Sequence, residues 1–414
     1  MYYYTCQNRK FAALDTLPLE SCAPAAADEP LSFLISRPPE NRRTCFLATD
    51  PRQLTAQGDG VEWLDSRRIP SAEPELSGDV LRRISCGKLP VVNYAHPPWA
   101  FAENFYQSKI RKRRVNLLAV GDVGGTLLTA LKLLGGDCIS SLGICDLSEN
   151  TVNRWVAEMG QISWPWDYDA LPDVAAVSPE NLFDCDVFIF AAAKAVPAVG
   201  SAVGDVRMAQ FTANRPLVER FARQARDANF PGLFVVLSDP VDPLCKAAYL
   251  ASNTGEGGKW DGQGLLAEQV QGFGLGVMNA RAASLAKADS RFSSFLHEGG
   301  SFGPHGEGLV IANSLTRYDD ALSQEFTEKV KTANLRIRDL GFKPYVAPAV
   351  SSGAMQLLLT LRGKWHCGSV CLGGVWFGVR NRFTPCGSET ESLALPDALF
   401  DRLKETEKIL VSIL

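Results

Sequence analysis

The sequence feature that most constrains the fold is an apolar run, Val115–Val120, that leads directly into a glycine-rich turn, GDVGG (residues 121–125). The segment after the turn, Thr126–Leu134, has the apolar periodicity of a helix. A strand that passes through such a turn into a helix leaves backbone N–H groups at the helix N-terminus, where they can bind a phosphate group. We therefore expect an anion-binding strand–turn–helix unit that begins near Val115.

The turn fits a dinucleotide. The glycine positions of the pattern GxGxxG fall at Ala119, Gly121 and Gly124, so the first of them is an alanine. The next strand-like run ends in Asp146, about 20 residues later, where a carboxylate can accept hydrogen bonds from the adenosine ribose. Such an acid would repel a 2′-phosphate, which favours NAD over NADP; the open alternative is a unit that binds no ligand. The expected NAD site comprises Ala119, Gly121, Asp122, Val123, Gly124, Asp146, Ala191 and Ala192.

Strands alternate with helices from residue 113 to residue 242. Strongly apolar runs such as DVFIFAA (residues 186–192) and LFVVLSD (residues 233–239) are typical of parallel strands covered by helices on both faces. A helical period begins at Pro216 and continues to Ala228. The sequence therefore predicts an α/β fold in which residues 113–242 form a Rossmann-like, NAD-binding domain with a parallel sheet.

The flanking regions have different compositions. Residues 1–112 are rich in Pro and Arg, and the strand-like runs LSFLIS, TCFLAT and GVEWLD (residues 31–36, 44–49 and 60–65) predict a small, partly β N-terminal extension. Residues 243–414 combine helical segments, a Gly-rich stretch, a strand-like run (368–379) and an amphipathic C-terminal helix (397–414). They predict a mixed α+β domain that carries the substrate site and packs on the sheet.

Composition argues against several classes of partner. The net charge of −4 is opposite to the basic footprint of nucleic-acid binding, and the short run KIRKRR (residues 109–114) is interpreted as a solvated lead-in to a strand. No apolar run is long enough to span a membrane. The eleven cysteines include no CxxC pair, which predicts free thiols in the cytoplasm. Because His366, Cys367 and Cys371 match no zinc-binding spacing, no metal site is expected.

A candidate catalytic group lies in the Gly-rich stretch. His305 is flanked by glycines in GPHGEG (residues 303–308), so little side-chain packing is expected around its imidazole. An imidazole can donate a proton to a carbonyl oxygen while a nicotinamide delivers a hydride to the carbon. A loop histidine is by default a surface residue, and its context decides between these alternatives.

From Val115 to the C-terminus the chain resembles the lactate/malate dehydrogenase family. The resemblance is carried by motifs in the family's order: AVGDVGGTLLTAL resembles the nucleotide turn, DVFIFAAA the fourth strand, and GPHGEG the catalytic loop. The remaining motifs are VRMAQFTAN (residues 206–214), LSDPVDPL (237–244), GVMNARA (276–282) and the segment of residues 373–403, which is similar to the family's C-terminal strand, hairpin and helix.

This resemblance implies a role for each matching residue. His305 would be the proton donor and acceptor, and Arg281 would hold the carboxylate of a 2-oxo or 2-hydroxy acid through a bidentate pair. Arg207 would polarise the substrate carbonyl from a loop that closes over it, with Asn214 seven residues later as a further substrate contact. The resemblance also implies assembly as a homo-oligomer, either a dimer or a tetramer.

Three positions depart from the family's pattern. Asp239 replaces the substrate-contacting asparagine of the motif S-N-P-V-D; ionised, it would disfavour an anionic substrate, and protonated, it could still donate a hydrogen bond. Met278 stands where the family has the aspartate that orients the histidine, and the adjacent Asn279 could hold the imidazole tautomer instead. Ser201 occupies the specificity position, where it offers no cation for a dicarboxylic acid.

The leading hypothesis is therefore an NAD-dependent 2-hydroxy acid dehydrogenase. The departures at Asp239 and Met278 leave open a non-catalytic NAD-binding protein on the same fold, whose N-terminal region would bind a partner. A third interpretation, an NAD-dependent glycosidase, needs a Cys/His metal site that the sequence does not show.

Overall fold

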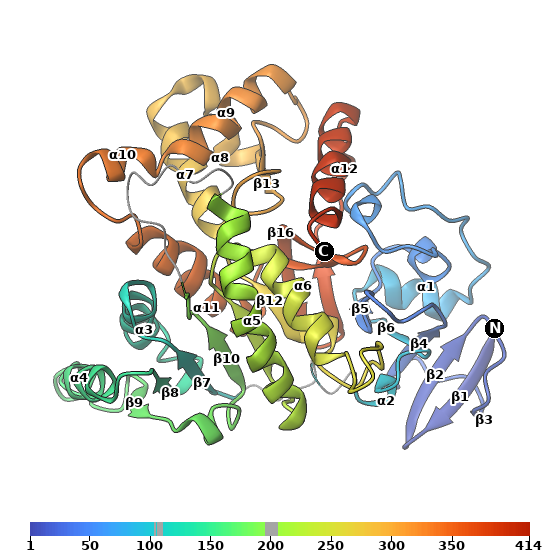
Figure 1. The fold of residues 1–414 in the computed structure, drawn as a ribbon. Coiled ribbons are helices and arrows are strands. Elements are labelled where there is room, and N and C mark those ends of the chain that lie inside the picture. The colour runs from blue at the N-terminus through green and yellow to red at the C-terminus, as the bar shows by residue number, and fades with distance from the viewer. Residues whose placement is uncertain (103–104, 106–110, 195–205) are drawn as a thin grey trace.

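The protein is described by a computed structural model, which covers residues 1–102, 105, 111–194 and 206–414. Its main element is a 15-stranded sheet to which all regions of the chain contribute strands (Figure 1). The strand order is β3-β1-β2-β4-β6-β5-β17-β16-β15-β12-β11-β10-β7-β8-β9. The N-terminal strands form one end of this sheet, and the strands that follow the glycine turn form the other.

The half of the sheet from β9 to β12 is parallel and doubly wound. Its strands are β7 (Arg113–Leu118), β8 (Ile139–Cys145), β9 (Asp173–Ala176), β10 (Val187–Phe190), β11 (Leu233–Val236) and β12 (Val270–Gly272). Each lies parallel to its neighbours in the order β9-β8-β7-β10-β11-β12. The chain winds outward from β7 to β9 and then returns to the other side of β7, so the strand order reverses between β7 and β10. This is the Rossmann arrangement, and the predicted fold class is confirmed.

The two faces of the parallel sheet are buried by different helices. Phe188 and Phe190 of β10 point into a core shared with α5 (Val206–Asp227) and α6 (Val241–Ser252). Val187 and Ile189 of the same strand point into the opposite core. That core is completed by α3 (Asp122–Leu134), α4 (Glu149–Met159) and α11 (Met355–Leu361). Alternate residues of a strand face opposite sides, so a strand buried on both faces is apolar throughout.

The C-terminal region continues the sheet with antiparallel strands. β15 (His366–Leu372) pairs with β12, and β16 (Val375–Thr384) and β17 (Gly387–Thr390) follow in order. The separate hairpin of β13 (Gly300–Phe302) and β14 (Val310–Ala312) contains the GPHGEG loop. The region's other elements are η5 (Ala267–Gln269), α7 (Leu275–Ala288), η6 (Ser290–Phe292), α8 (Phe295–Glu298), α9 (Asp320–Thr332), α10 (Leu335–Asp339), η7 (Pro348–Ala354) and α12 (Asp397–Val411).

The N-terminal region extends the same sheet. Phe46 in β5 lies opposite Ser388 in β17, and this parallel pair joins the N-terminal strands to the rest of the molecule. The strands are β1 (Tyr2–Cys6), β2 (Arg9–Ala13), β3 (Glu20–Ser21), β4 (Leu31–Ile35), β5 (Cys45–Leu47) and β6 (Pro90–Asn93). The helices are η1 (Pro51–Leu54), η2 (Val61–Leu64), α1 (Gly78–Ser85) and α2 (Trp99–Ala102), and η4 (Pro179–Asn181) lies farther along the chain.

Three local predictions were wrong. The segment GVEWLD is the 3-10 helix η2 rather than a strand, because Glu407 of α12 accepts a hydrogen bond from the backbone N–H of Val61 (3.3 Å) and holds a turn there. The helix after the glycine turn begins at Asp122, not at Thr126. Helix α5 begins at Val206, ten residues before the expected start, and passes through Pro216. None of the described helices is long and apolar enough to cross a membrane.

Candidate active site

The glycine turn brings strand β7 and helix α3 into close contact. Ala119 at the end of β7 has φ = 71°, the left-handed conformation that glycine adopts most easily. A Cβ atom on Gly124 would lie 2.0 Å from the carbonyl oxygen of Ala119, so only glycine fits there. A Cβ atom on Gly121, the residue before α3, would meet no atom within 4 Å. The space in front of the helix N-terminus is therefore open to a ligand.

Asp146 lies beside this turn, at the end of β8. Its Oδ2 accepts a hydrogen bond from the backbone N–H of Val120 (2.9 Å), and its Oδ1 accepts one from Ser148 (3.1 Å). The side chain is partly exposed, and each carboxylate oxygen can accept a second hydrogen bond. The geometry thus fits a carboxylate that binds a ribose, and that role stays a prediction. Lys343 forms an ion pair with Asp122 (3.2 Å) and adds a positive charge beside the helix N-terminus.

The ends of β10 and β11 are held together by Asn214 of α5. Its Oδ1 accepts a hydrogen bond from the backbone N–H of Lys194 (2.8 Å), and its Nδ2 donates one to the carbonyl oxygen of Asp239 (2.9 Å). The side chain is buried. Ser238 also donates a hydrogen bond to the carbonyl oxygen of Ala192 (2.7 Å). Asn214 therefore contacts backbone groups on both sides, and its predicted contact with substrate stays a prediction.

His305 is held by its backbone against α6 and α7. A Cβ atom on Gly274, the residue before α7, would lie 2.9 Å from the Cβ of His305, so the loop packs closely on this helix end. The backbone N–H of His305 lies beside the carboxyl group of Asp242 and favours its charged form, and the hydroxyl of Ser369 donates a hydrogen bond to that group. Asp242 is 2% exposed. Burial raises the pKa of Asp242 to about 6, and these two polar groups oppose that rise.

Arg281 and Asp239 place opposite charges near one another. Burial lowers the pKa of Arg281, and the negative charge of the nearby Asp239 opposes this effect. Asp239 is exposed, and its charge also acts on Asp242. The Nη1 atom of Arg281 lies 3.6 Å from the sulfur of the buried Met278 and 3.5 Å from the carbonyl oxygen of Val330. Arg281 is thus partly buried and close enough to the carboxylate of Asp239 to interact with its charge.

The other predicted residues are placed less completely. Asn279 is partly buried, and its Oδ1 accepts a hydrogen bond from the hydroxyl of Ser301 (3.1 Å). Ser201 lies outside the described residues. Arg207 is the second residue of helix α5 rather than part of the expected loop, and its side chain is not described. Ala191 and Ala192 follow β10 and pack on opposite faces of the sheet. Among the residues that are described, no group of three or more His, Cys, Asp or Glu could hold a metal ion.

Asp242, Ser369 and Lys343 were not singled out from the sequence. Asp242 lies inside the motif LSDPVDPL, but its hydrogen bond to Ser369 and its proximity to the His305 backbone join segments that are far apart in the chain. The charge of Lys343 faces the glycine turn from the loop after α10, which no local pattern indicated.

Comparison with solved structures identifies this fold. The chain is similar to a minor L-lactate dehydrogenase from Enterococcus mundtii, with a TM-score of 0.58 and 19% sequence identity over 73% of this chain and 97% of that one. It is also similar to a malate dehydrogenase from Archaeoglobus fulgidus in complex with NADH, with a TM-score of 0.58 and 16% identity over 73% and 98% of the two chains. This chain has the lactate/malate dehydrogenase fold.

A third similar structure is the malate dehydrogenase from Cryptosporidium parvum, with a TM-score of 0.56 and 16% identity over 73% of this chain and 98% of that one. No family model matches the sequence, and no curated protein matches it. The resemblance expected from the motifs is therefore confirmed for the fold, in a chain whose sequence has diverged strongly. Nearly the whole length of each dehydrogenase is matched, and about a quarter of this chain lies outside the match.

Proposed function

We propose that this protein is an NAD-dependent oxidoreductase that interconverts a 2-hydroxy acid and a 2-oxo acid. The observation that carries the proposal is the gathering of its candidate residues at the carboxyl ends of the parallel strands, where open α/β sheets bind ligands. The glycine turn follows β7, Asp146 follows β8, and Asp239 follows β11. His305 packs at Gly274, two residues after the end of β12.

The glycine turn fits NAD on two grounds. The open space at Gly121 lets a pyrophosphate approach the backbone N–H groups of α3, and the free acceptor sites of Asp146 suit a ribose. When bound, the cofactor would supply a hydride to the 2-oxo carbon in its reduced form and accept one from the 2-hydroxy carbon in its oxidised form. The residues of the protein would hold the substrate next to the cofactor and would donate or accept the proton.

We assign the proton transfer of this reaction to His305. Its imidazole would donate a proton to the carbonyl oxygen of the 2-oxo acid and take it back in the reverse direction. Arg281 would bind the substrate carboxylate, and Arg207 would polarise the carbonyl. Asp239 would contact the substrate beside the carbonyl, and Asn279 would support the imidazole. Ser201, as the specificity position, disfavours a dicarboxylic acid.

The test is turnover of NADH with a panel of 2-oxo acids that differ in side-chain size and charge. The expected result is oxidation of NADH with at least one acid, and a loss of roughly 100-fold or more in kcat for the variant His305→Asn. His297→Asn is the matched control, because His297 is an exposed residue of α8. Equal turnover by wild type and His305→Asn would exclude His305 as the proton donor.

A second candidate function is a non-catalytic NAD-binding protein whose N-terminal region binds a partner. It is favoured by the burial of Met278, whose sulfur faces Arg281 in place of the carboxylate that would stabilise an imidazolium. This candidate predicts that NADH raises the melting temperature while no 2-oxo acid of the panel is reduced.

We also propose a homo-oligomer, either a dimer or a tetramer, located in the cytoplasm. Light scattering coupled to size-exclusion chromatography measures the molar mass, and a value equal to the 45.0 kDa of one chain would contradict the assembly.

A further inference from the structure

The connection between helix α4 and strand β9 carries three exposed aromatic rings. Trp164 is 60% exposed, Trp166 90% and Tyr168 69%. None of these rings belongs to a hydrophobic core cluster in the described part of the chain. Given the surface of an aromatic side chain, roughly 400 Å² of ring surface is open to solvent. Exposed apolar patches of this size mark interaction sites on soluble proteins, so the segment is a candidate docking surface.

A tight turn keeps these rings at the surface. The backbone N–H of Asp167 donates a hydrogen bond to the carbonyl oxygen of Trp164 (3.3 Å), so Pro165 and Trp166 are the two central residues of the turn. Proline is favoured at the first central position, and Trp166 has φ = 64°, as the second central residue of a type II turn does. Trp166 therefore stands at the tip, where its ring is the most exposed of the three. We call residues 164–168 the aromatic turn.

The charge at the aromatic turn is negative. Residues 163–173 contain Asp167, Asp169 and Asp173, all of them exposed, and no Lys or Arg. Among the described residues, no basic side chain forms an ion pair with Asp167 or Asp169. Asp173 lies near Lys132, which is buried and donates a hydrogen bond to the carbonyl oxygen of Pro172 (3.0 Å). Carboxylates beside open indole rings attract a guanidinium or ammonium group, because the face of an indole also binds cations.

An open strand edge follows the aromatic turn. Strand β9 begins at Asp173 and is the last strand of the sheet, with β8 on one side. In the part of the chain that the structure describes, no strand pairs with its outer side. Such an edge offers backbone N–H and C=O groups to an added strand. A partner in an extended conformation could therefore pair with β9 and place its side chains beside the turn.

This surface is separate from the candidate active site. The active-site residues lie at the carboxyl ends of the parallel strands, whereas the aromatic turn precedes β9 and lies on the amino side. Gly136, just after α3, supports this placement, because a Cβ atom there would lie 2.1 Å from the carbonyl oxygen of Ala170. Figure 1 shows α4 and β9 at the opposite end of the molecule from the N-terminal strands. The surface can thus be occupied while the active site stays open.

We propose that the aromatic turn and the edge of β9 dock an extended, cationic segment of a partner protein. Basic side chains of the partner would lie on the indole of Trp166 and pair with Asp167 and Asp169, while its backbone would pair with β9. An anionic membrane would be repelled by the same carboxylates, and a second copy of this surface would bring like charges together. The proposal is independent of the proposed dehydrogenase activity.

The test is fluorescence anisotropy of dye-labelled peptides titrated with the full chain. The probes are octapeptides that alternate Thr with Arg, with Glu or with Ser, since alternation places the charged side chains on one face of an extended strand. The expected result is saturable binding of the Thr-Arg peptide alone, weakened by added salt. Trp166→Ala should lower its affinity at least about 10-fold, and Asp167→Asn combined with Asp169→Asn about 3- to 10-fold.

The matched controls remove similar groups elsewhere on the surface. Phe342→Ala removes an aromatic ring that is 68% exposed, and Asp401→Asn removes an exposed carboxylate of α12; both should bind the Thr-Arg peptide as the wild type does. Far-UV circular dichroism checks that each variant is folded. Because no NADH or 2-oxo acid is present, a failure of the proposed dehydrogenase reaction would not affect the result.

Four outcomes overturn the proposal. The first is that the Thr-Arg peptide does not bind, and the second is that the Thr-Glu or Thr-Ser peptide binds as tightly. The third is that folded Trp166→Ala and the double aspartate variant both bind as the wild type does. The fourth is another occupant: vesicles of phosphatidylglycerol that bind the wild type but not Trp166→Ala, or a lower molar mass of Trp166→Ala in light scattering, which would reveal a second copy of the chain.

Discussion

The carboxyl group of Asp242 lies beside the backbone N–H of His305, which favours its charged form. The same carboxyl group is bonded to the hydroxyl of Ser369 in β15 and lies in the first turn of α6. A buried group thus ties the loop that carries the proposed proton donor to a helix and to a strand. The position of His305 depends on this carboxyl group as well as on the loop's own sequence.

We expect Asp242→Asn to lower kcat of the proposed reaction by about 10-fold or more, because an amide can direct an N–H toward the His305 N–H and displace the loop. The dissociation constant for NADH should change by less than about 2-fold, since the glycine turn lies elsewhere. Steady-state kinetics and a fluorescence titration measure the two quantities. Asp184→Asn, at an exposed position, serves as the control. An equal loss of NADH binding would show a general structural defect instead.

The pH dependence of stability should contain a contribution from Glu268. Its Oε1 accepts a hydrogen bond from the backbone N–H of Cys45 (2.8 Å), and burial raises its pKa to about 7. The folded state therefore binds this proton more tightly than the unfolded state does. The free energy of unfolding therefore decreases as the pH rises. The decrease begins near the pKa of the unfolded glutamate, about 4.3, is complete above pH 7, and amounts to about 3 kcal/mol.

Urea unfolding at pH 5 and at pH 8 measures this difference. Glu268→Gln should make the two free energies of unfolding more similar, whereas Glu405→Gln, at an exposed position, should leave their difference unchanged. Asp242 contributes with the same sign, so part of the pH dependence should remain in Glu268→Gln. An unaltered difference in Glu268→Gln would mean that Glu268 titrates normally in the folded state.

Two glycines of the turn should respond differently to the same substitution. Gly124→Ala places a methyl group 2.0 Å from a backbone oxygen and should lower the free energy of unfolding by about 2–4 kcal/mol. Gly121→Ala meets no atom within 4 Å and should cost less than about 1 kcal/mol. Its methyl group would stand where the pyrophosphate is proposed to lie, so NADH affinity should fall at least about 10-fold. Wild-type NADH affinity in Gly121→Ala would place the cofactor elsewhere.

Ala119 should be more stable as glycine. Its φ of 71° is strained for a residue with a Cβ atom, so Ala119→Gly should raise the free energy of unfolding by about 0.5–1 kcal/mol. Ala157→Gly at an exposed position of α4 should lower it by about 1 kcal/mol. Chemical denaturation of both variants measures the contrast, and two losses of equal size would contradict the strained conformation.

The parallel strands could be predicted from the sequence because their signal is local. β10 and β11 are buried on both faces, so their residues are apolar without interruption. The predicted strand at residues 115–120 was displaced by two residues from β7, because the chain already leaves the extended conformation at Ala119. The start of α3 was missed because the glycines of the turn were not expected to be helical.

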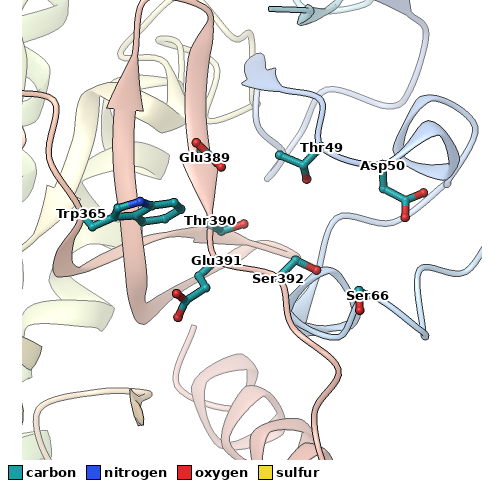
Figure 2. Close-up of a pocket in the computed structure, with 8 residues that line it drawn as sticks. All are labelled: Thr49, Asp50, Ser66, Trp365, Glu389, Thr390, Glu391 and Ser392. Atoms are coloured by element: carbon teal, nitrogen blue, oxygen red, sulfur yellow. The ribbon is translucent and has the colours of Figure 1, made fainter. Parts of the chain in front are cut away.

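Features that depend on distant contacts could not be predicted in this way. Proline was interpreted as the start of α5, but Phe211 packs in the same core as Val218 and Ala222, and this packing outweighs the cost of a proline inside the helix. The pairing of β5 with β17, a pocket beside it (Figure 2) and the hydrogen bond between Asp242 and Ser369 each join segments that are far apart in the chain. Periodicity and motif spacing contain no information about such pairs.

The strand pairing at Phe46 and Ser388 predicts how a truncated form of the protein would behave in solution. A shortened chain that begins after residue 112 would keep the strands of the dehydrogenase fold but would expose the side of β17 that β5 now covers. An uncovered strand edge is a template for pairing with another chain. Truncation at that boundary should therefore yield a protein that aggregates through β17, which size-exclusion chromatography would detect.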